Sequence, residues 1–134
     1  MELDKDFLDK LFEQAEANPR LRQNFDLRTS SADTSQRMLN ALMPGTIVKI
    51  HRHEDTTETV VCLCGRMDEV IYEASPQPSS EGKGYVEQFV EVERIHLCPA
   101  EGHYGCQIPK GAWHTVEVIE PSVIFEAKDG AYKG

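Results

Sequence analysis

Two histidines and a glutamate lie close together in the stretch GTIVKIHRHEDTTETVVCLCG, residues 45–65. A single residue separates His51 from His53, so in an extended chain their side chains point to the same face. Glu58 follows a polar segment typical of a turn, which would place its carboxylate on a neighbouring strand beside the imidazoles. Two imidazoles and a carboxylate on adjacent strands can bind one side of a transition-metal ion and leave other positions open.

A fourth ligand is expected from a distant segment, IPKGAWHTVEV at 108–118. Pro109 and Gly111 predict a tight turn, and His114 opens the strand that follows. Three histidines and one glutamate would hold one divalent transition metal and leave positions for water, substrate or dioxygen. Because such a ligand set suits Fe, Mn, Ni, Co or Zn, the sequence does not identify the metal.

Short apolar-rich runs separated by turn residues fill the chain from Arg37 onward and predict β structure. The expected strands are 37–43, 46–53, 57–64, 66–73, 85–98, 104–108, 113–119 and 122–128. The polar stretch at 74–84 predicts a solvated hairpin tip. Because no helical pattern separates the strands, we expect an all-β, antiparallel sandwich or barrel.

The beginning of the chain has a different pattern. Residues 3–18 place apolar side chains at helical spacing and predict an amphipathic helix that packs on the domain or on a partner subunit. Pro19 disfavours a longer helix. We therefore expect residues 1–36 to form an N-terminal helix with a connection, and residues 37–134 to form a single β-barrel domain.

Composition narrows the classes of partner. The 134 residues include 14 Lys and Arg against 23 Asp and Glu, a formal net charge of −9. This charge disfavours nucleic acid or an anionic membrane as a partner and leaves a small-molecule ligand as the expectation. The chain has no long apolar run, and its start has no basic and apolar leader, so we expect a soluble cytoplasmic protein.

The cysteines have no established metal or redox spacing. Cys62 and Cys64 are separated by one residue, and Cys98 and Cys106 come later. We expect free thiols that pack as small apolar side chains. A four-thiolate metal site and a redox-sensing pair stay open as alternatives.

At this point a resemblance to a known family is visible. The first motif of the cupin superfamily has matching residue types and spacing in Gly45, His51, His53, Glu58 and Gly65. The segment PKGAWH resembles the core of the second cupin motif. The resemblance implies a small jelly-roll β-barrel with one metal bound by His51, His53, Glu58 and His114. His103 and Val118 depart from the second motif, which has glycine and asparagine there.

A narrower resemblance covers nearly the whole chain. The segments PRLRQNF, SQRMLNALMPGTIVKIHRHED, IPKGAWHTVE and FEAKDGAY resemble the WbuC family of cupin-fold metalloproteins. That family is encoded in bacterial O-antigen and other surface-polysaccharide clusters. The resemblance implies that Arg37, Asn40 and Lys128 contact the substrate, and cupin barrels often pair through their sheets, so we expect a homodimer.

Several functions stay open on this evidence. One is a metal-dependent isomerase or epimerase that acts on a sugar or sugar nucleotide. The alternatives are an iron-dependent dioxygenase and a non-catalytic carbohydrate-binding or sensor module. The sequence identifies no catalytic base outside the metal ligands. We expect Trp113 to pack in the core, His103 and Tyr104 to lie near the mouth of the barrel, and His96 to lie on the surface.

Overall fold

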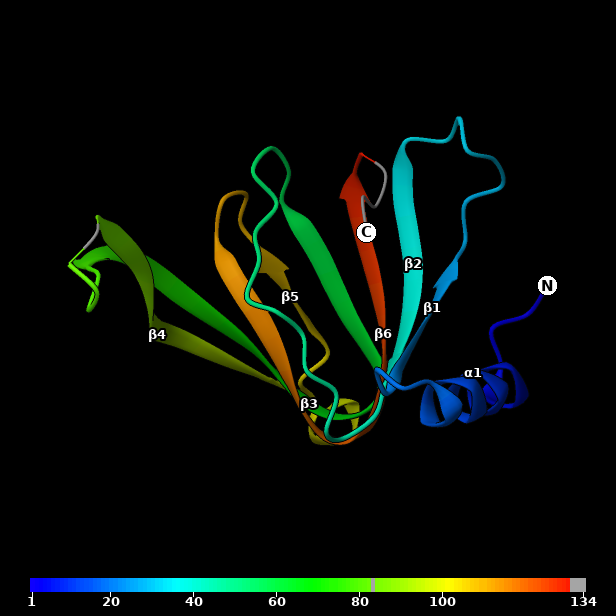
Figure 1. Ribbon diagram of the computed structural model, residues 1–134. Helices are drawn as coiled ribbons and strands as arrows, with labels where there is room; N and C mark the ends of the chain where they lie inside the picture. Colours follow the sequence, from blue (N-terminus) through cyan, green and yellow to red (C-terminus); the bar gives the residue numbers. More distant parts are fainter. Residues whose placement is uncertain (83, 131–134) are drawn as a thin grey trace.

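Antiparallel strands form most of the chain in the computed structural model, which describes residues 1–82 and 84–130 (Figure 1). The elements in chain order are α1 (Lys5–Ala17), β1 (Arg22–Asp26), β2 (Ser35–Leu42), β3 (Glu58–Pro78), β4 (Tyr85–Leu97), the short 3₁₀ helix η1 (Pro99–Glu101), β5 (Gly105–Ile108) and β6 (Trp113–Asp129). The predicted mostly-β fold with one N-terminal helix is confirmed.

The two long strands, β3 and β6, hold the sheet together. The strand order is β1-β2-β6-β3-β4, and β5 pairs with the beginning of β3. The first half of β3 lies between β5 and the end of β6, and its second half lies between β4 and the start of β6. The sheet therefore bends into two arms that meet at the base in Figure 1 and diverge above it. Among the described residues, the hydrogen-bonded path does not close on itself.

Four of the predicted strands join in pairs to form two continuous strands in the structure. Segments 57–64 and 66–73 are parts of β3, and segments 113–119 and 122–128 are parts of β6. Register shifts between Cys62 and Met67 let both strands bend instead of breaking. Gly65 permits this bend because it has φ +99°, and a Cβ atom there would lie 2.3 Å from the Pro121 carbonyl oxygen.

Other parts of the prediction need correction. The segment 46–53 is not a strand: it is irregular, and only His51 forms a bridge, with His114. The region between the helix and residue 36 is more than a connection, because β1 lies within it and pairs with β2. The loop at 74–84 is shorter than expected, since β3 and β4 continue to Pro78 and from Tyr85.

The helix packs on its own chain. Asp4 caps α1 by accepting a hydrogen bond from the Phe7 backbone N–H at 2.9 Å. Leu11 and Ala15 are buried against β2 and β6, in a cluster with Leu39, Ala41 and Val123. Of the two expected packing partners for this helix, the structure therefore selects the domain. The division at residue 36 stays a prediction.

A second apolar cluster fills the space near the bend of the sheet. Its buried members come from both arms and are Leu42, Val60, Cys62, Met67, Ile71, Leu97, Ile108 and Ile124.

All four cysteines are free thiols, and burial raises the pKa of Cys62 to about 11 and that of Cys106 to about 12. No helix among the described residues is both long and apolar enough to cross a bilayer.

Candidate metal centre and its cavity

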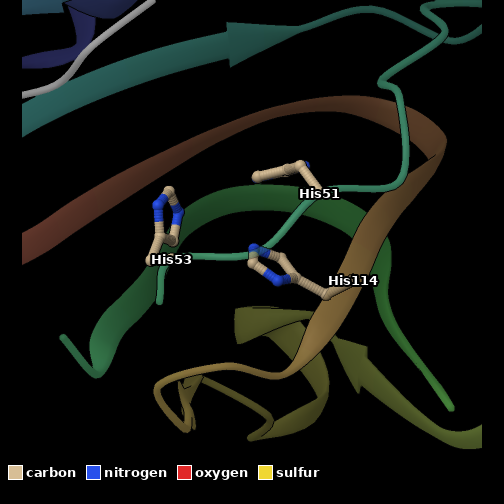
Figure 2. A group of neighbouring side chains, drawn as sticks. All are labelled: His51, His53 and His114. Atoms are coloured by element: carbon tan, nitrogen blue, oxygen red, sulfur yellow. The ribbon is translucent and has the colours of Figure 1, made fainter. Parts of the chain in front are cut away.

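Three histidines from two distant parts of the chain meet in one place. His51 and His53 come from the irregular segment before β3, and His114 is the second residue of β6. One ring nitrogen from each histidine lies within 4.8 Å of the other two. Figure 2 shows the three side chains grouped around a common space. The ring centroids of His51 and His114 are 4.3 Å apart, the shortest of the three separations.

Backbone hydrogen bonds hold the irregular segment against β6. The His51 N–H donates to the His114 carbonyl at 3.0 Å, and the His114 N–H donates back at 2.8 Å. The Gly111 N–H donates to the His53 carbonyl at 2.7 Å. Gly111 has φ +80°, a conformation that glycine adopts without strain. The predicted turn at 109–111 thus binds the backbone of His53, and the bridge to His114 holds His51 against β6.

Two carbonyl groups fix the tautomers of His51 and His114. The Nδ1 atom of His51 lies 2.8 Å from the Lys49 carbonyl oxygen, and Nδ1 of His114 lies 2.9 Å from that of Ala112. Because a carbonyl oxygen only accepts, each Nδ1 carries the proton and each Nε2 keeps a lone pair for a metal. Burial lowers the pKa of His114 to about 4, so this imidazole is neutral at pH 7.

Glu58 lies beside the histidine group. It is the first residue of β3 and is 3% exposed, and its Oε2 atom lies 3.1 Å from Nε2 of His53. Neighbouring ligands of one ion with bonds of about 2.1 Å lie about 3 Å apart. The separation of Glu58 and His53 therefore fits two adjacent ligands. Without an ion it is a close contact between the imidazole nitrogen and the carboxylate oxygen.

A cavity of about 90 Å³ lies next to the ligands, and His51, Glu58 and His114 form part of its wall. Its polar wall also includes Asn40, Glu69 and Glu126, from β2, β3 and β6. The Asn40 side-chain amide donates to Glu126 Oε1 at 3.4 Å. Neither Glu69 Oε2 nor Asn40 Oδ1 has a hydrogen-bond partner among the described residues, although both atoms are buried. Buried polar atoms of this kind are expected to bind a ligand, an ion or water.

The carboxyl groups of the cavity take up protons readily. Burial, with the nearby Glu58 carboxylate, raises the pKa of Glu126 to about 8. Burial, with the charges of Glu126 and Glu58, raises the pKa of Glu69 well above its ordinary value. Two buried carboxyl groups, Glu58 and Glu69, and the half-buried Glu126 form an environment that a cation would stabilise. Three imidazole nitrogens therefore lie close enough together to bind one divalent transition metal. The predicted fourth ligand, Glu58, lies beside His53 but outside the set of ligand atoms that are all within 4.8 Å of one another.

The predicted substrate contacts lie in different surroundings. Asn40 lines the cavity. Arg37 does not line it, and its guanidinium pairs with Asp33 at 2.7 Å. The Lys128 amino group donates to the Gly130 carbonyl at 3.2 Å, and its charge moderates the raised pKa of Glu126. The end of the quoted segment FEAKDGAY, residues 131 and 132, lies outside the described residues.

Sequence reasoning missed Glu69 and Glu126. Both lie in strands with side chains buried or half-buried on both faces, so alternation did not show which face lines the cavity. The one available signal was a glutamate next to an apolar residue, as in Glu69-Val70 and Phe125-Glu126-Ala127. An acidic residue in such a position is costly to bury and is therefore a functional candidate.

Trp113, His103 and Tyr104 are not part of the cavity wall. Trp113 is half-buried and packs on Phe89 with ring centroids 5.0 Å apart, and the Arg52 guanidinium lies 4.6 Å above its ring. His103 and Tyr104 are exposed and do not line the cavity, and the expectation that they lie near the mouth of the barrel stays a prediction. His103 instead lies beside His96, with ring centroids 6.1 Å apart.

The fold is similar to that of several solved structures. The protein TT1209 from Thermus thermophilus is 23% identical with a TM-score of 0.59, and the match covers 97% of this chain and 98% of that chain. The cupin domain of Cnp3 from Schizosaccharomyces pombe is 7% identical with a TM-score of 0.52, and the match covers 82% of this chain and 65% of that chain. The capsular polysaccharide assembling protein CapF from Staphylococcus aureus is 15% identical with a TM-score of 0.56, covering 87% of this chain but only 30% of CapF.

These likenesses show the fold alone, and they fit the jelly-roll arrangement of a cupin. No curated protein matches the sequence. A family model matches residues 3–81, which include the helix, the first three strands, His51, His53 and Glu58. The chain therefore belongs to the family described as a domain of unknown function, DUF6016.

Proposed function

We propose that this chain is a metal-dependent enzyme of WbuC type that isomerises or epimerises a small polar metabolite, a sugar or a sugar nucleotide. The metal would be held by His51, His53, Glu58 and His114. The proposal includes a closed jelly-roll barrel, a homodimer and a role in surface-polysaccharide (O-antigen) biosynthesis. The resemblance to the WbuC family supports the last of these, and the description of CapF suggests the class of metabolite to test first.

The observation that carries the proposal is the placement of two kinds of group around one cavity. On one side, the Nε2 lone pairs of His51 and His114 are available for a metal. On the other side are Glu69 and Glu126, two carboxyl groups whose pKa values are raised by burial and by neighbouring carboxylates. A metal in such a site acts as a Lewis acid that polarises a carbonyl or hydroxyl oxygen.

Isomerisation and epimerisation require a group that removes a proton from carbon and returns it. Glu126 suits this role because burial places its pKa at about 8, close to the pH at which a cell operates. The Asn40 amide orients the Glu126 carboxyl group at 3.4 Å. Glu69 Oε2 and Asn40 Oδ1 are free among the described residues to accept hydrogen bonds from substrate hydroxyl groups.

The size of the cavity limits what enters it. A volume of about 90 Å³ equals that of about three water molecules. Only the reacting end of a sugar therefore fits beside the metal ligands, and the remainder must extend outside. A nucleotide or phosphate group of the substrate would lie beyond the cavity.

The test is proton exchange in deuterated water. Metal-loaded protein is incubated with a panel of sugar nucleotides and sugar phosphates, and NMR follows deuterium incorporation at carbon. We expect exchange with one class of sugar, loss of exchange in Glu126→Gln with metal content retained, and the same rate without oxygen. Turnover only in the presence of oxygen would overturn the proposal in favour of a dioxygenase. Saturable binding without exchange would overturn it in favour of a binding module.

A further inference from the structure

A second group of metal-ligating side chains lies outside the cavity, at the end of β4. It contains His96 in β4, Cys98 directly after it and Glu101 in η1. One ligand atom from each lies within 4.8 Å of the other two. The segment lies at the base of the molecule where the two arms meet (Figure 1). None of these residues lines the cavity of the three histidines.

The imidazole of His96 is oriented by a carboxylate. Its Nδ1 atom lies 2.8 Å from Oδ1 of the buried Asp68, whose other oxygen accepts from Arg94 at 3.0 Å. Since the carboxylate accepts, the proton lies on Nδ1, and the lone pair of Nε2 is directed away from Asp68. A carboxylate behind the ligating histidine is a common feature of protein zinc sites.

The turn that follows β4 fixes the other donors. The Cys98 N–H donates to the His103 carbonyl at 2.8 Å, and the His103 N–H donates back at 3.1 Å. This bridge closes the short loop that carries η1 and places His103 across from Cys98. Cys98 is 3% exposed, whereas Glu101 and His103 are exposed. The site is thus open to solvent on the side of the carboxylate.

A positive charge already lies among these donors. Arg66 Nη1 donates to His96 Nε2 at 3.2 Å, and the same guanidinium pairs with Glu101. The imidazole lone pair and the carboxylate therefore bind a cation, and at present that cation is a side chain. Arg66 is half-buried and has a second partner available, because its Nε atom lies 3.7 Å from the Glu120 carboxylate.

We propose that His96, Cys98 and Glu101 form a second, zinc-type metal site for which Arg66 competes. The donors are an imidazole nitrogen, a thiolate and a carboxylate oxygen, a set that Zn²⁺ and Co²⁺ accept in tetrahedral sites. His103 supplies the fourth ligand by turning its ring. On binding, the Cys98 thiol releases its proton to solvent, the sulfur binds the ion, and the guanidinium shifts to Glu120. The site therefore couples metal binding to the position of Arg66.

Cobalt provides the probe, because a Co²⁺–thiolate bond absorbs strongly in the near ultraviolet. The experiment uses the full chain with His51→Ala and His114→Ala, so that the first site does not contribute. We expect a saturable charge-transfer band on addition of Co²⁺, which Zn²⁺ displaces. Cys98→Ser in this background abolishes the band, whereas the matched control Cys64→Ser retains it.

A further variant tests the competition directly. Arg66→Gln removes the guanidinium, and we expect tighter Co²⁺ binding by about tenfold, the change that corresponds to loss of ~1.4 kcal/mol of competing interaction. An arginine that merely supports the turn would give weaker binding in this variant.

Three results would overturn the second site. They are no band in a variant whose circular dichroism shows a folded protein, a band that persists in Cys98→Ser, and weaker binding in Arg66→Gln. A failure of the first site can be told apart from a failure of the second. It appears as an absence of metal binding in Cys98→Ser, a variant that lacks the second site but keeps the three histidines.

Discussion

Each histidine of the candidate metal centre is controlled by a different neighbour. Backbone carbonyls hold the Nδ1 atoms of His51 and His114, and the Glu58 carboxylate lies 3.1 Å from Nε2 of His53. Only His114 is fully buried, and its pKa is lowered for that reason. The residue types alone suggested these histidines as candidate ligands, but not which nitrogen of each ring would be available.

The lowered pKa of His114 predicts a pH dependence of stability in the metal-free protein. Between pH 6.5 and about 4 the unfolded chain binds a proton at this residue and the folded chain does not. The unfolding free energy should therefore fall as the pH falls through this range, by up to ~3 kcal/mol. Urea unfolding at pH 7 and pH 4.5 measures this fall in unfolding free energy. The fall should be smaller in His114→Gln than in the wild-type protein. Equal losses in both proteins would contradict the assignment.

Glu126 predicts the opposite dependence. Its pKa is raised to about 8, so between pH 4.5 and 8 the folded chain binds a proton that the unfolded chain releases. The wild-type protein should lose stability as the pH rises through this range, and Glu126→Gln should not. We expect the variant to be more stable than the wild type at pH 9 by more than about 1 kcal/mol. A variant that is less stable at pH 9 would show that the carboxyl group is not desolvated.

At the scale of elements, the site depends on segments that the sequence misassigned. The alternation around His51 and His53 predicts a strand, but the segment is irregular and is held by hydrogen bonds to His114 and Gly111. The convergence of His51, His53 and His114 was nevertheless predictable, because these histidines and the turn before His114 carry a specific motif. Their role as metal ligands, with Glu58, stays a prediction. Glu69 and Glu126 were not, because both faces of β3 and β6 contain buried residues.

The bend of β3 at Gly65 gives a prediction about folding stability. Gly65→Ala introduces a Cβ that lies 2.3 Å from the Pro121 carbonyl oxygen at a φ of +99°. We expect a loss of roughly 2–4 kcal/mol in unfolding free energy, since strain and a backbone clash combine. Gly82→Ala is the matched control, because Gly82 also has a positive φ but no atom lies within 4 Å of its added Cβ. Equal losses in the two variants would mean that the contact at Pro121 does not constrain β3.

At the scale of the whole molecule, the antiparallel architecture followed from turn residues and short apolar runs. The continuity of β3 and β6 through their bends did not, because glycine and proline at residues 65 and 121 indicate breaks when only local sequence is considered. The sequence did not show what the helix packs on, and the structure does. Leu11 and Ala15 on its apolar face are buried against β2 and β6.

The helix should accordingly stabilise the single chain. Leu11 is 3% exposed within the cluster that joins α1 to the sheet. Leu11→Ala should reduce the unfolding free energy by about 2–4 kcal/mol, as for other buried leucines. Sedimentation equilibrium should show the same oligomeric state for the variant as for the wild type. Dissociation of a wild-type dimer by this substitution would contradict packing of the helix within its own chain.

The central claim is that His51, His53, Glu58 and His114 bind one metal, and metal analysis tests it most directly. Cys98→Ser is the reference protein, so that the second proposed site does not contribute. After loading with Mn²⁺, Fe²⁺, Co²⁺, Ni²⁺ or Zn²⁺ and desalting, elemental analysis should give stoichiometric metal in Cys98→Ser. The same analysis should give almost none in Cys98→Ser with His51→Ala. Equal metal in the two proteins, or none in either under every loading condition, would contradict the account.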